Sequence, residues 1–243
     1  MPSVTPTTAR AHAFVDDLAE PRLRDDDHRH LTRVLRLPTG ATVTVGDGAG
    51  SWRVCQLRAD PELDIEGEIV TDPRPEPQLT VACAIVKGHR PELVVQKLTE
   101  LGVDRVVPFV AERSVVRWDD AKTARQADRL TIIAREAAMQ CRRTYLPEIA
   151  DLTDFATVAR LPGATLADGT GQAPSLSARA VLVGPEGGWS DAERGFGLPL
   201  VRLGAHTLRS ETAAITAGAL LVAIRSSIVR SAAAPLVNGP HGT

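Results

Sequence analysis

The chain has 243 residues, of which 43% are hydrophobic and 24% charged, as expected of a globular protein that buries a core. Its formal net charge is -2, and only 3% of its residues are aromatic. These values exclude nucleic-acid binding through overall positive charge, and they argue against a binding surface built mainly on stacked rings. A chain of this length forms one large or two modest domains.

The cysteines and the apolar runs narrow the class further. Cys55, Cys83 and Cys141 lie far apart and form no CxxC or Cys/His spacing, so we predict neither a disulfide framework nor a metal site. No apolar run reaches the roughly 18 residues that cross a bilayer, and the N-terminal sequence lacks the apolar core of a signal peptide. We therefore expect a cytoplasmic protein with no membrane partner.

The first region, residues 1–73, combines one helix with several short strands. DDDHRHLTRVLRL has an acidic start and apolar Leu31, Val34 and Leu35 at helical spacing. ATVTVGDGAGSWRVCQL alternates at period two around a Gly-Asp-Gly turn, which predicts a hairpin, and LDIEGEIV predicts one further strand. These elements indicate a small β-barrel-like domain.

A proline-rich linker, TDPRPEPQ, separates this region from residues 78–230, because its prolines remove amide donors and restrict the residues before them. Strands are then predicted at QLTVACAIV, DRVVPFV, ATLAD, AVLVG and LVRLG, and helices at RPELVVQKLTELG, residues 121–141 and residues 211–228. This alternation indicates an α/β domain with a parallel sheet covered on both faces. Residues 231–243 are expected to form a disordered tail.

The most distinctive stretch is VLVGPEGGWSDAE, residues 181–193, where a buried strand meets a helix start. Glycines let the main chain approach a ligand closely, and Ser190 with Glu193 fits a capping box. The turn follows a late strand and lacks the Lys-Ser/Thr ending of a phosphate-binding loop, which disfavours nicotinamide cofactors and nucleoside triphosphates. Taken alone, the stretch fits a tight structural turn and a ligand-binding turn equally well.

Two other segments, LADGTG and LGAHTLRSETA, also follow short apolar strands and are rich in small or polar residues. Ligands of parallel sheets bind outside the carboxyl ends of the strands. We therefore expect the three segments to converge on one ligand. The closing helix contains TAAITAGALLVAI, whose small residues allow close packing.

GPEGGWSDAE followed by LGAHTLRSETAAITA resembles the C-terminal signature of the SPOUT methyltransferases. The similarity is greatest to the family that methylates N3 of a uridine in small-subunit (16S) ribosomal RNA. KGHRPELVVQKLTELGVDRVVPF with ERSVV, then REAAMQCRR with LPEI, follow that family's earlier blocks in order, and HRHLTRVLRLPTGATVTVGDGAG resembles its PUA-like RNA-binding domain. The resemblance covers most of residues 10–225. Met139 departs from it, because the family usually has an acidic residue there.

The resemblance implies a PUA-like β-barrel over residues 1–73 and a SPOUT domain over residues 78–230 with a deep trefoil knot, a rare exception to the rule against threaded chains. It also implies a homodimer in which each active site uses both subunits and S-adenosyl-L-methionine binds in the knot. The residues that it places at the cofactor are Leu166, Asp168, Gly184, Pro185, Glu186, Gly187, Gly188, Leu203, Gly204, Thr207, Leu208, Arg209, Thr212 and Ala213.

Methylation of uridine N3 requires that N3 lose its proton. A carboxylate can accept the proton, or an arginine can stabilise the anion as it forms. Arg209 and Glu211 are the candidates, with Glu186 behind them, although Glu211 suits the N-terminal dipole of the last helix equally well. Contacts to RNA phosphates are predicted for a set of basic residues: Arg33, Arg36, Lys87, Arg90, Arg113, Arg142 and Arg143.

We therefore predict an S-adenosylmethionine-dependent methyltransferase acting on N3 of a uridine in ribosomal RNA within the assembled small subunit. A SPOUT ribose 2′-O-methyltransferase is the nearest alternative, but the Asn/Gly-rich, Arg-bearing loop that usually opens that domain is missing here. A non-catalytic RNA-binding or ribosome assembly factor is the alternative from another class. The intact glycine and RSET motifs disfavour it.

Overall fold

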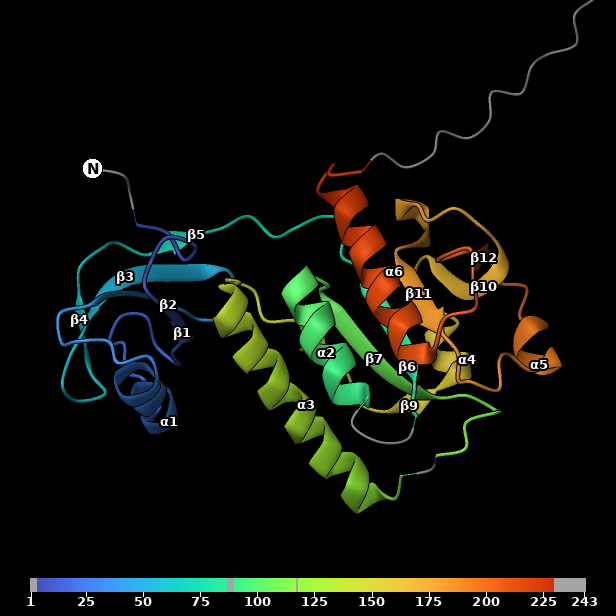
Figure 1. The fold of residues 1–243 in the computed structure, drawn as a ribbon, viewed down its shortest axis with the longest axis horizontal. Helices are drawn as coiled ribbons and strands as arrows, with labels where there is room; N and C mark the ends of the chain where they lie inside the picture. Colours follow the sequence, from blue (N-terminus) through green and yellow to red (C-terminus); the bar gives the residue numbers. More distant parts are fainter. Residues whose placement is uncertain (1–3, 87–89, 117, 230–243) are drawn as a thin grey trace, which may run out of the picture.

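The structure is a computed structural model that describes residues 4–86, 90–116 and 118–229. The expected tail, residues 231–243, lies outside the described residues. Two sheets lie side by side along the longest axis of the molecule, with the α3 helix, Asp120–Cys141, running past both (Figure 1). The last strand of the first sheet ends at Thr71 and the second sheet begins at Thr80, on either side of the proline-rich linker. The domain boundaries and the trefoil knot remain predictions.

The first sheet has the strand order β1-β2-β3-β4, and β5 also pairs with β3. Its strands are β1 (His12–Phe14), β2 (Thr42–Gly46), β3 (Ser51–Leu57), β4 (Leu63–Ile65) and β5 (Val70–Thr71). β2 and β3 form the predicted antiparallel hairpin, and the turn glycines Gly48 and Gly50 have φ of +77° and +102°. Val43, Val45 and Leu57 lie at the centre of the core of this domain.

Two predictions for this domain are wrong in detail. LDIEGEIV forms two short strands, because the amides of Glu66 and Gly67 both donate to the Val54 carbonyl and interrupt the ladder. The expected single helix is α1 (Asp25–Arg29) followed by a π-helical turn, His30–Val34. This wider turn rotates the later side chains away from the core, so that Leu31 is buried whereas Val34 and Leu35 are 66% and 47% exposed.

The second sheet is parallel throughout, as predicted, with the order β12-β10-β11-β6-β7-β8 and with β9 beside β7. Its strands are β6 (Thr80–Ala84), β7 (Arg105–Val110), β8 (Glu148–Ile149), β9 (Thr153–Asp154), β10 (Ala164–Gln172), β11 (Ala180–Val183) and β12 (Leu200–Val201). The helices are α2 (Arg90–Leu101), α3, α4 (Phe155–Val158), α5 (Asp191–Arg194) and α6 (Ser210–Arg225), with a 3-10 turn at Leu176–Ala178.

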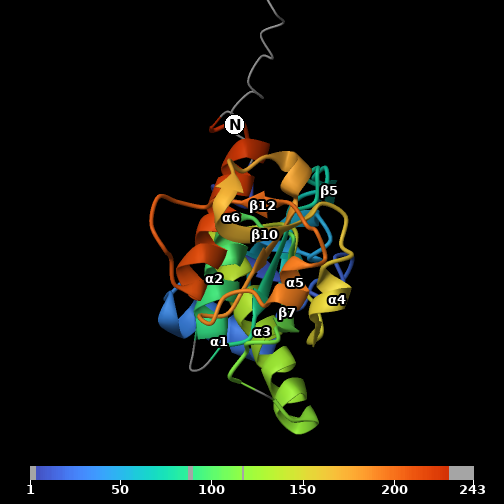
Figure 2. The ribbon, with the colours of Figure 1, turned by 90° about the vertical axis from the view of Figure 1, so that its right-hand side faces the viewer.

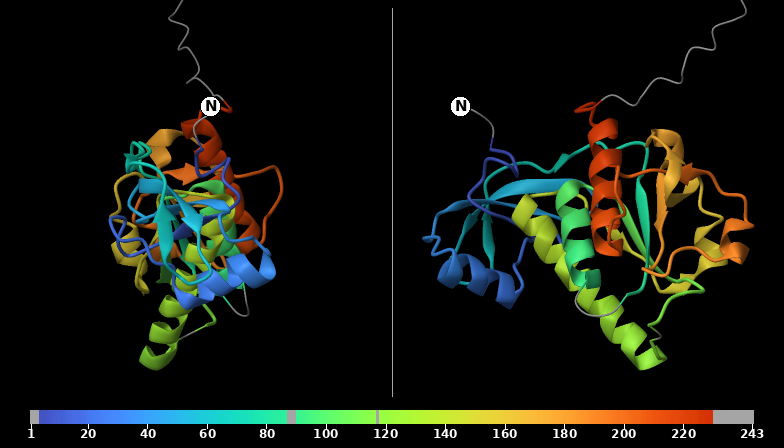
Figure 3. Two further views of the ribbon diagram at one scale, coloured as in Figure 1. Left: turned by 90° about the vertical axis from the view of Figure 1, so that its left-hand side faces the viewer. Right: turned by 45° about the vertical axis from the view of Figure 1, so that its right-hand side comes forward.

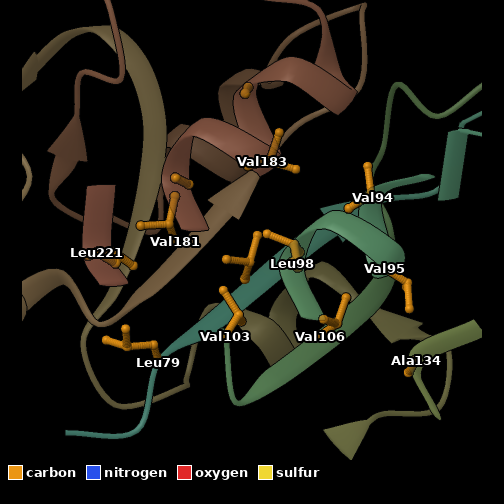
Figure 4. Close-up of a cluster of buried hydrophobic side chains, with 14 of the residues drawn as sticks. Leu79, Val94, Val95, Leu98, Val103, Val106, Ala134, Val181, Val183 and Leu221 are labelled. Carbon is orange, nitrogen blue, oxygen red and sulfur yellow. The ribbon is translucent and has the colours of Figure 1, made fainter. Parts of the chain in front are cut away.

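Side chains alternate between the two faces of this sheet, and each face is covered. Val81, Val106 and Val181 pack with α2, α3 and α6 in one buried cluster, where Leu98 of α2 lies among the strand residues (Figure 4). Leu182, next to Val181 in sequence, points to the other face, with α4 and an aromatic group. The period-two alternation thus buries both faces, as the parallel arrangement requires.

The two domains contact each other through α3 and the segment that follows it (Figure 3). The Tyr145 hydroxyl donates to the main-chain carbonyl of Asp72 at 2.8 Å, and the Leu146 amide donates to the Gly48 carbonyl at 2.9 Å. Within the described residues, no helix has both the length and the apolar character needed to cross a membrane.

Candidate active site

A cavity of about 350 Å³ lies beside the end of β11, the middle of β10 and the start of α6. Figure 2 shows this end of the molecule, with β10, β12 and α5 toward the viewer. Its lining comes from the three segments expected to converge on one ligand, as residues 167–169, 183–186, 188–189, 203–208, 210 and 213, together with Arg194. The volume lies within the usual range for small-molecule sites.

The glycine-rich turn between β11 and α5 has a fixed shape. A Cβ on Gly184 would approach the Trp189 ring to 3.2 Å, and Gly188 has a φ of +69°, so both positions favour glycine. Ser190 and Glu193 form the predicted capping box: the Glu193 amide donates to Ser190 Oγ at 3.2 Å, and the Ser190 amide donates to Glu193 Oε2 at 2.8 Å. The turn therefore enters α5 at a defined position.

Aromatic packing attaches this turn to the neighbouring strands. The indole Nε1 of Trp189 donates to the Ala167 carbonyl at 3.0 Å, which links the turn to β10. The Trp189 ring stacks on Phe109 of β7, with 6.3 Å between centroids and an interplanar angle of 7°, and Phe155 packs against both rings. These contacts attach one wall of the cavity to the sheet.

The segment between β12 and α6 offers main-chain groups to the cavity. Residues 203–208 line it, and none of their N–H or C=O groups has a hydrogen bond to another residue in the described part of the chain. Leu203 and Leu208 add apolar side chains to the same wall, and Ser210 Oγ donates to the Gly184 carbonyl at 3.2 Å. This wall suits a flat, polar-edged group, which apolar side chains can cover while main-chain groups meet its edge.

A fixed carboxylate lies at the β10 side of the cavity. Asp168 Oδ1 accepts from the Thr170 amide at 2.9 Å and from its hydroxyl at 2.7 Å, and Oδ2 accepts from Arg194 Nη2 at 2.7 Å. These hydrogen bonds, those from Thr170 above all, lower the pKa of Asp168 to about 2. Asp168 is therefore ionised at neutral pH.

Most residues assigned to the cofactor line this cavity, namely Asp168, Gly184, Pro185, Glu186, Gly188, Leu203, Gly204, Thr207, Leu208 and Ala213. Leu166 does not, because it is buried in the core of the sheet. A Cβ on Gly187 would face Arg113 at 3.2 Å, and Arg209 and Thr212 are exposed beside the cavity without lining it.

Sequence reasoning missed several lining residues, notably Trp189, Arg194, His206 and Ser210. Trp189 and Ser210 adjoin assigned residues, so extending the motifs by one position would have found them. Arg194 ends the short helix that the capping box begins, and its approach to Asp168 depends on how α5 packs. Its sequence position carried no signal of that approach.

The catalytic candidates lie at the first turn of α6. Arg209 is the exposed N-cap residue. Glu211 lines a separate apolar cavity of about 30 Å³ with Cys83 and Trp118, and Ser210 lines both cavities. Glu211 thus adjoins the larger cavity in the chain without lining it. A carboxylate at this position also favours the helix dipole, so the catalytic roles of both residues remain predictions.

The basic residues predicted to bind RNA divide into two groups. Arg33, Arg36 and Arg113 are exposed, and Arg113 Nη1 donates to the Gly187 carbonyl at 3.1 Å. Arg142 donates to the Thr7 carbonyl at 2.7 Å, and Arg143 donates to the carbonyls of Thr99 and Val103, each at 2.9 Å. These last two guanidinium groups are thereby engaged within the fold. Lys87 and the Arg90 side chain lie outside the described part of the structure.

The sequence matches two family descriptions. Residues 73–222 match the RNA methyltransferase domain, and residues 23–70 match the RNA methyltransferase PUA domain. The chain belongs to the RNA methyltransferase family. The N-terminal RNA methyltransferase PUA domain thus corresponds to the first sheet, and the methyltransferase domain contains the cavity.

Named relatives cover most of this RNA methyltransferase. It is 32% identical over 221 residues to the ribosomal RNA small subunit methyltransferase E of Synechocystis. The aligned region covers 82% of this chain and 71% of the relative. It is 27% identical over 214 residues to the protein of the same name from Mycobacterium bovis, and this alignment covers 79% of the chain and 82% of the relative. These are proteins to which the chain is similar.

Solved structures share its fold. The ribosomal RNA small subunit methyltransferase E of Neisseria gonorrhoeae, bound to S-adenosyl methionine, is 27% identical with a TM-score of 0.75, covering 89% of this chain and 97% of that one. A methyltransferase from Legionella pneumophila, in complex with the same cofactor, is 26% identical with a TM-score of 0.73 and the same coverage.

Proposed function

We propose that this chain is a cytoplasmic, homodimeric enzyme that uses S-adenosyl-L-methionine to methylate N3 of a uridine in small-subunit ribosomal RNA, within the assembled subunit. The proposed domains are a PUA-like domain over residues 1–73 and a knotted SPOUT domain over residues 78–230. The observation that carries the proposal is the convergence of three segments on one cavity, one within β10 and two after β11 and β12. The relatives named above are small-subunit ribosomal RNA methyltransferases, and the two solved structures hold this cofactor.

The cavity fits this cofactor chemically. Its apolar wall and the main-chain groups of residues 203–208 suit an adenine ring, which needs both a covered face and edge hydrogen bonds. Gly204 presents open space, because a Cβ there would approach nothing closer than Leu208 at 3.9 Å. Asp168 and Glu186 supply negative charge for the positively charged end of the ligand.

When bound, S-adenosylmethionine supplies a methyl group on a positively charged sulfur. The protein must hold the uridine in line with that group, and such positioning provides much of the rate enhancement. The protein must also handle the N3 proton. We assign this role to the first turn of α6, where Glu211 can accept the proton and Arg209 can stabilise the anion.

The exposed face of α6 supports the dimer. The helix carries no charged residue between Glu211 and Arg225. Ala213, Ala217 and Leu221 are buried within the domain. Six other side chains form a half-buried stripe at helical spacing: Ile215, Thr216, Ala219, Leu220, Ala223 and Ile224. An apolar stripe of this length suits packing against a second copy of the helix, close to the segment that lines the cavity.

RNA contact is assigned to the exposed basic residues of both domains. Arg33 and Arg36 lie on the π-helical turn and its exit, and Arg113 lies beside the glycine-rich turn. Because the net charge is -2, these local cations must meet the RNA phosphates.

A transfer assay tests the proposal. Purified protein and labelled S-adenosylmethionine are incubated with small ribosomal subunits from a strain that lacks the gene, and the nucleosides are then analysed by mass spectrometry. We expect N3-methyluridine to form. Gly204→Trp should abolish it by filling the cavity, whereas Ala192→Trp, at an exposed position outside the cavity, should keep it.

The other outcomes separate the alternatives. A ribose-methylated nucleoside would keep the cofactor and overturn the N3 assignment. Transfer to naked RNA but not to subunits would overturn the assembled substrate. A third outcome would favour a non-catalytic RNA-binding protein. In it, no methyl group is transferred, no cofactor binds, and S-adenosylmethionine leaves the melting temperatures of the unmodified protein and Gly204→Trp the same.

A further inference from the structure

The charges lining the large cavity are few and mixed. Among the described residues, its lining includes two carboxylates, those of Asp168 and Glu186, and one guanidinium, that of Arg194. S-adenosylmethionine carries an ammonium, a sulfonium and a carboxylate, which is the opposite set of charges. The cavity and the ligand are therefore complementary in both net charge and the number of charges of each sign.

The ion pair between Asp168 and Arg194 leaves bonding capacity on both sides. The pair is 2.7 Å long, and the two side chains are 12% and 46% exposed. Arg194 uses Nη2 for Asp168, and its Nη1 and Nε have no hydrogen-bond partner among the described residues. Asp168 Oδ2 accepts only this one bond in the described part of the chain, so it can accept another.

The fold holds both members of the pair in place. Thr170 fixes the Asp168 carboxylate through two hydrogen bonds to Oδ1. The capping box of Ser190 and Glu193 fixes the start of α5, and Arg194 follows Glu193 directly. A preformed acid–base pair of this kind loses little freedom when a ligand with two opposite charges binds to it.

We propose that Arg194 and Asp168 bind the amino-acid end of S-adenosylmethionine, Arg194 holding the carboxylate and Asp168 the ammonium. The inference rests on the proposed cofactor and adds the side chains that recognise one end of it. Residues 203–208 are left to the adenine, because they offer main-chain groups and apolar side chains without a carboxylate or guanidinium. An α-amino acid zwitterion matches a carboxylate next to a guanidinium, since each charge finds a charge-assisted hydrogen bond.

The test compares two ligands by calorimetry on the full-length protein. 5′-Methylthioadenosine keeps the adenosine and the sulfur of S-adenosylmethionine but lacks the amino-acid end. We expect Arg194→Ala to weaken S-adenosylmethionine binding by about tenfold, as expected for loss of one charge-assisted contact at a partly exposed site. Binding of 5′-methylthioadenosine should change less than about twofold, because its contacts remain.

Two further variants sharpen the comparison. Arg194→Lys should recover part of the loss, since it keeps the charge but not the planar fork. Arg202→Ala, which removes a nearby exposed cation outside the cavity, should leave both affinities unchanged. Asp168→Asn should, like Arg194→Ala, weaken the binding of S-adenosylmethionine more than that of 5′-methylthioadenosine.

The outcomes distinguish this inference from the proposed function. If Arg194→Ala weakens both ligands equally, or neither, the assignment of the amino-acid end is wrong while the cofactor stands. If the unmodified protein binds neither ligand, the proposed cofactor fails and this assignment fails with it.

Discussion

The buried His12 gives this protein a defined response to acid. His12 is 3% exposed, and its Nδ1 lies 3.0 Å from Thr44 Oγ1. Burial, and then the positive charge of Arg142, lowers the pKa of His12 from 6.5 to about 4. The folded protein therefore keeps this ring neutral at pH values where the unfolded chain protonates it.

This shift predicts the direction of a pH effect. Above pH 6.5 the ring is neutral in both states, and between pH 6.5 and about 4 only the unfolded chain takes up the proton. His12 should thus lower the free energy of unfolding by about 1.4 kcal/mol for each pH unit across that window. Urea unfolding from pH 7.5 to pH 5 should show a shallower decline for His12→Asn. If the free energy of unfolding fell equally steeply with pH in the unmodified protein and in His12→Asn, the pKa of His12 would not be lowered in the folded state.

Residue roles that depend on distant main chain could not be predicted from the sequence. Arg142 and Arg143 look like a surface cation pair in CRRTY, but their partners are carbonyls of residues 40 or more positions away. Asp168, in contrast, was assigned through the resemblance, and it does line the cavity. The segment LADGTG was expected to follow a short strand, but it lies within β10, which continues to Gln172. A motif shared with a family can be read from the sequence, whereas the capture of a guanidinium by a remote carbonyl depends on tertiary packing.

At the scale of elements, one carboxylate joins the glycine-rich turn to the loop after β7. Glu193 is 3% exposed, and its Oε1 accepts from the Glu112 amide at 2.9 Å while Oε2 accepts from the Ser190 amide. The capping box alone was predictable from Ser-Asp-Ala-Glu. The bond to Glu112 was not, because it joins residues 81 positions apart.

Glu193→Gln tests this junction. The glutamine side chain has the size of the glutamate side chain, but its NH2 group replaces one of the two accepting oxygens. That NH2 group faces the main-chain N–H of Glu112 or Ser190, so one hydrogen bond is lost and a buried main-chain N–H is left unpaired. We expect the free energy of unfolding to fall by about 2 kcal/mol. Urea unfolding measures the change, and Glu112→Gln is the control, since it alters an exposed side chain and keeps the main-chain bond. If both variants lowered the free energy of unfolding equally, the cause would be the loss of a negative charge and not the loss of the hydrogen bond to Glu112.

Element type was predictable where the hydrophobic period was regular. The strands β6, β7, β10, β11 and β12 and the helices α2, α3 and α6 follow from their patterns, whereas the two-residue strands β8 and β9 were not predicted. The π-helical turn was not, because Leu31, Val34 and Leu35 have ordinary helical spacing and only the bond from the Leu35 amide to the His30 carbonyl shows the wider turn. After this turn the chain continues to Leu37, which packs against the core.

At the scale of the whole molecule, a largely buried ion pair joins the two domains. Arg135 of α3 forms a bidentate pair with Asp27 of α1, at 2.6 Å and 3.1 Å, and donates to the Phe14 carbonyl at 3.0 Å. The two side chains are 15% and 11% exposed. Met139 packs against the core of the first domain with its sulfur 3.6 Å from Arg135 Nη1, and Asp27 supplies the negative charge that pairs with Arg135.

A double-mutant cycle should detect this link between the domains. Asp27→Asn and Arg135→Gln should each lower the free energy of unfolding by about 3 kcal/mol, because each leaves a poorly solvated charge without its partner. The double variant should lose less than the sum, since it leaves neither charge unpaired. The exposed pair of Arg105 and Glu148, 2.9 Å apart, is the matched control and should show a coupling of at most about 1 kcal/mol. Additive losses at Asp27 and Arg135 would show that contacts other than this ion pair set the orientation of the domains.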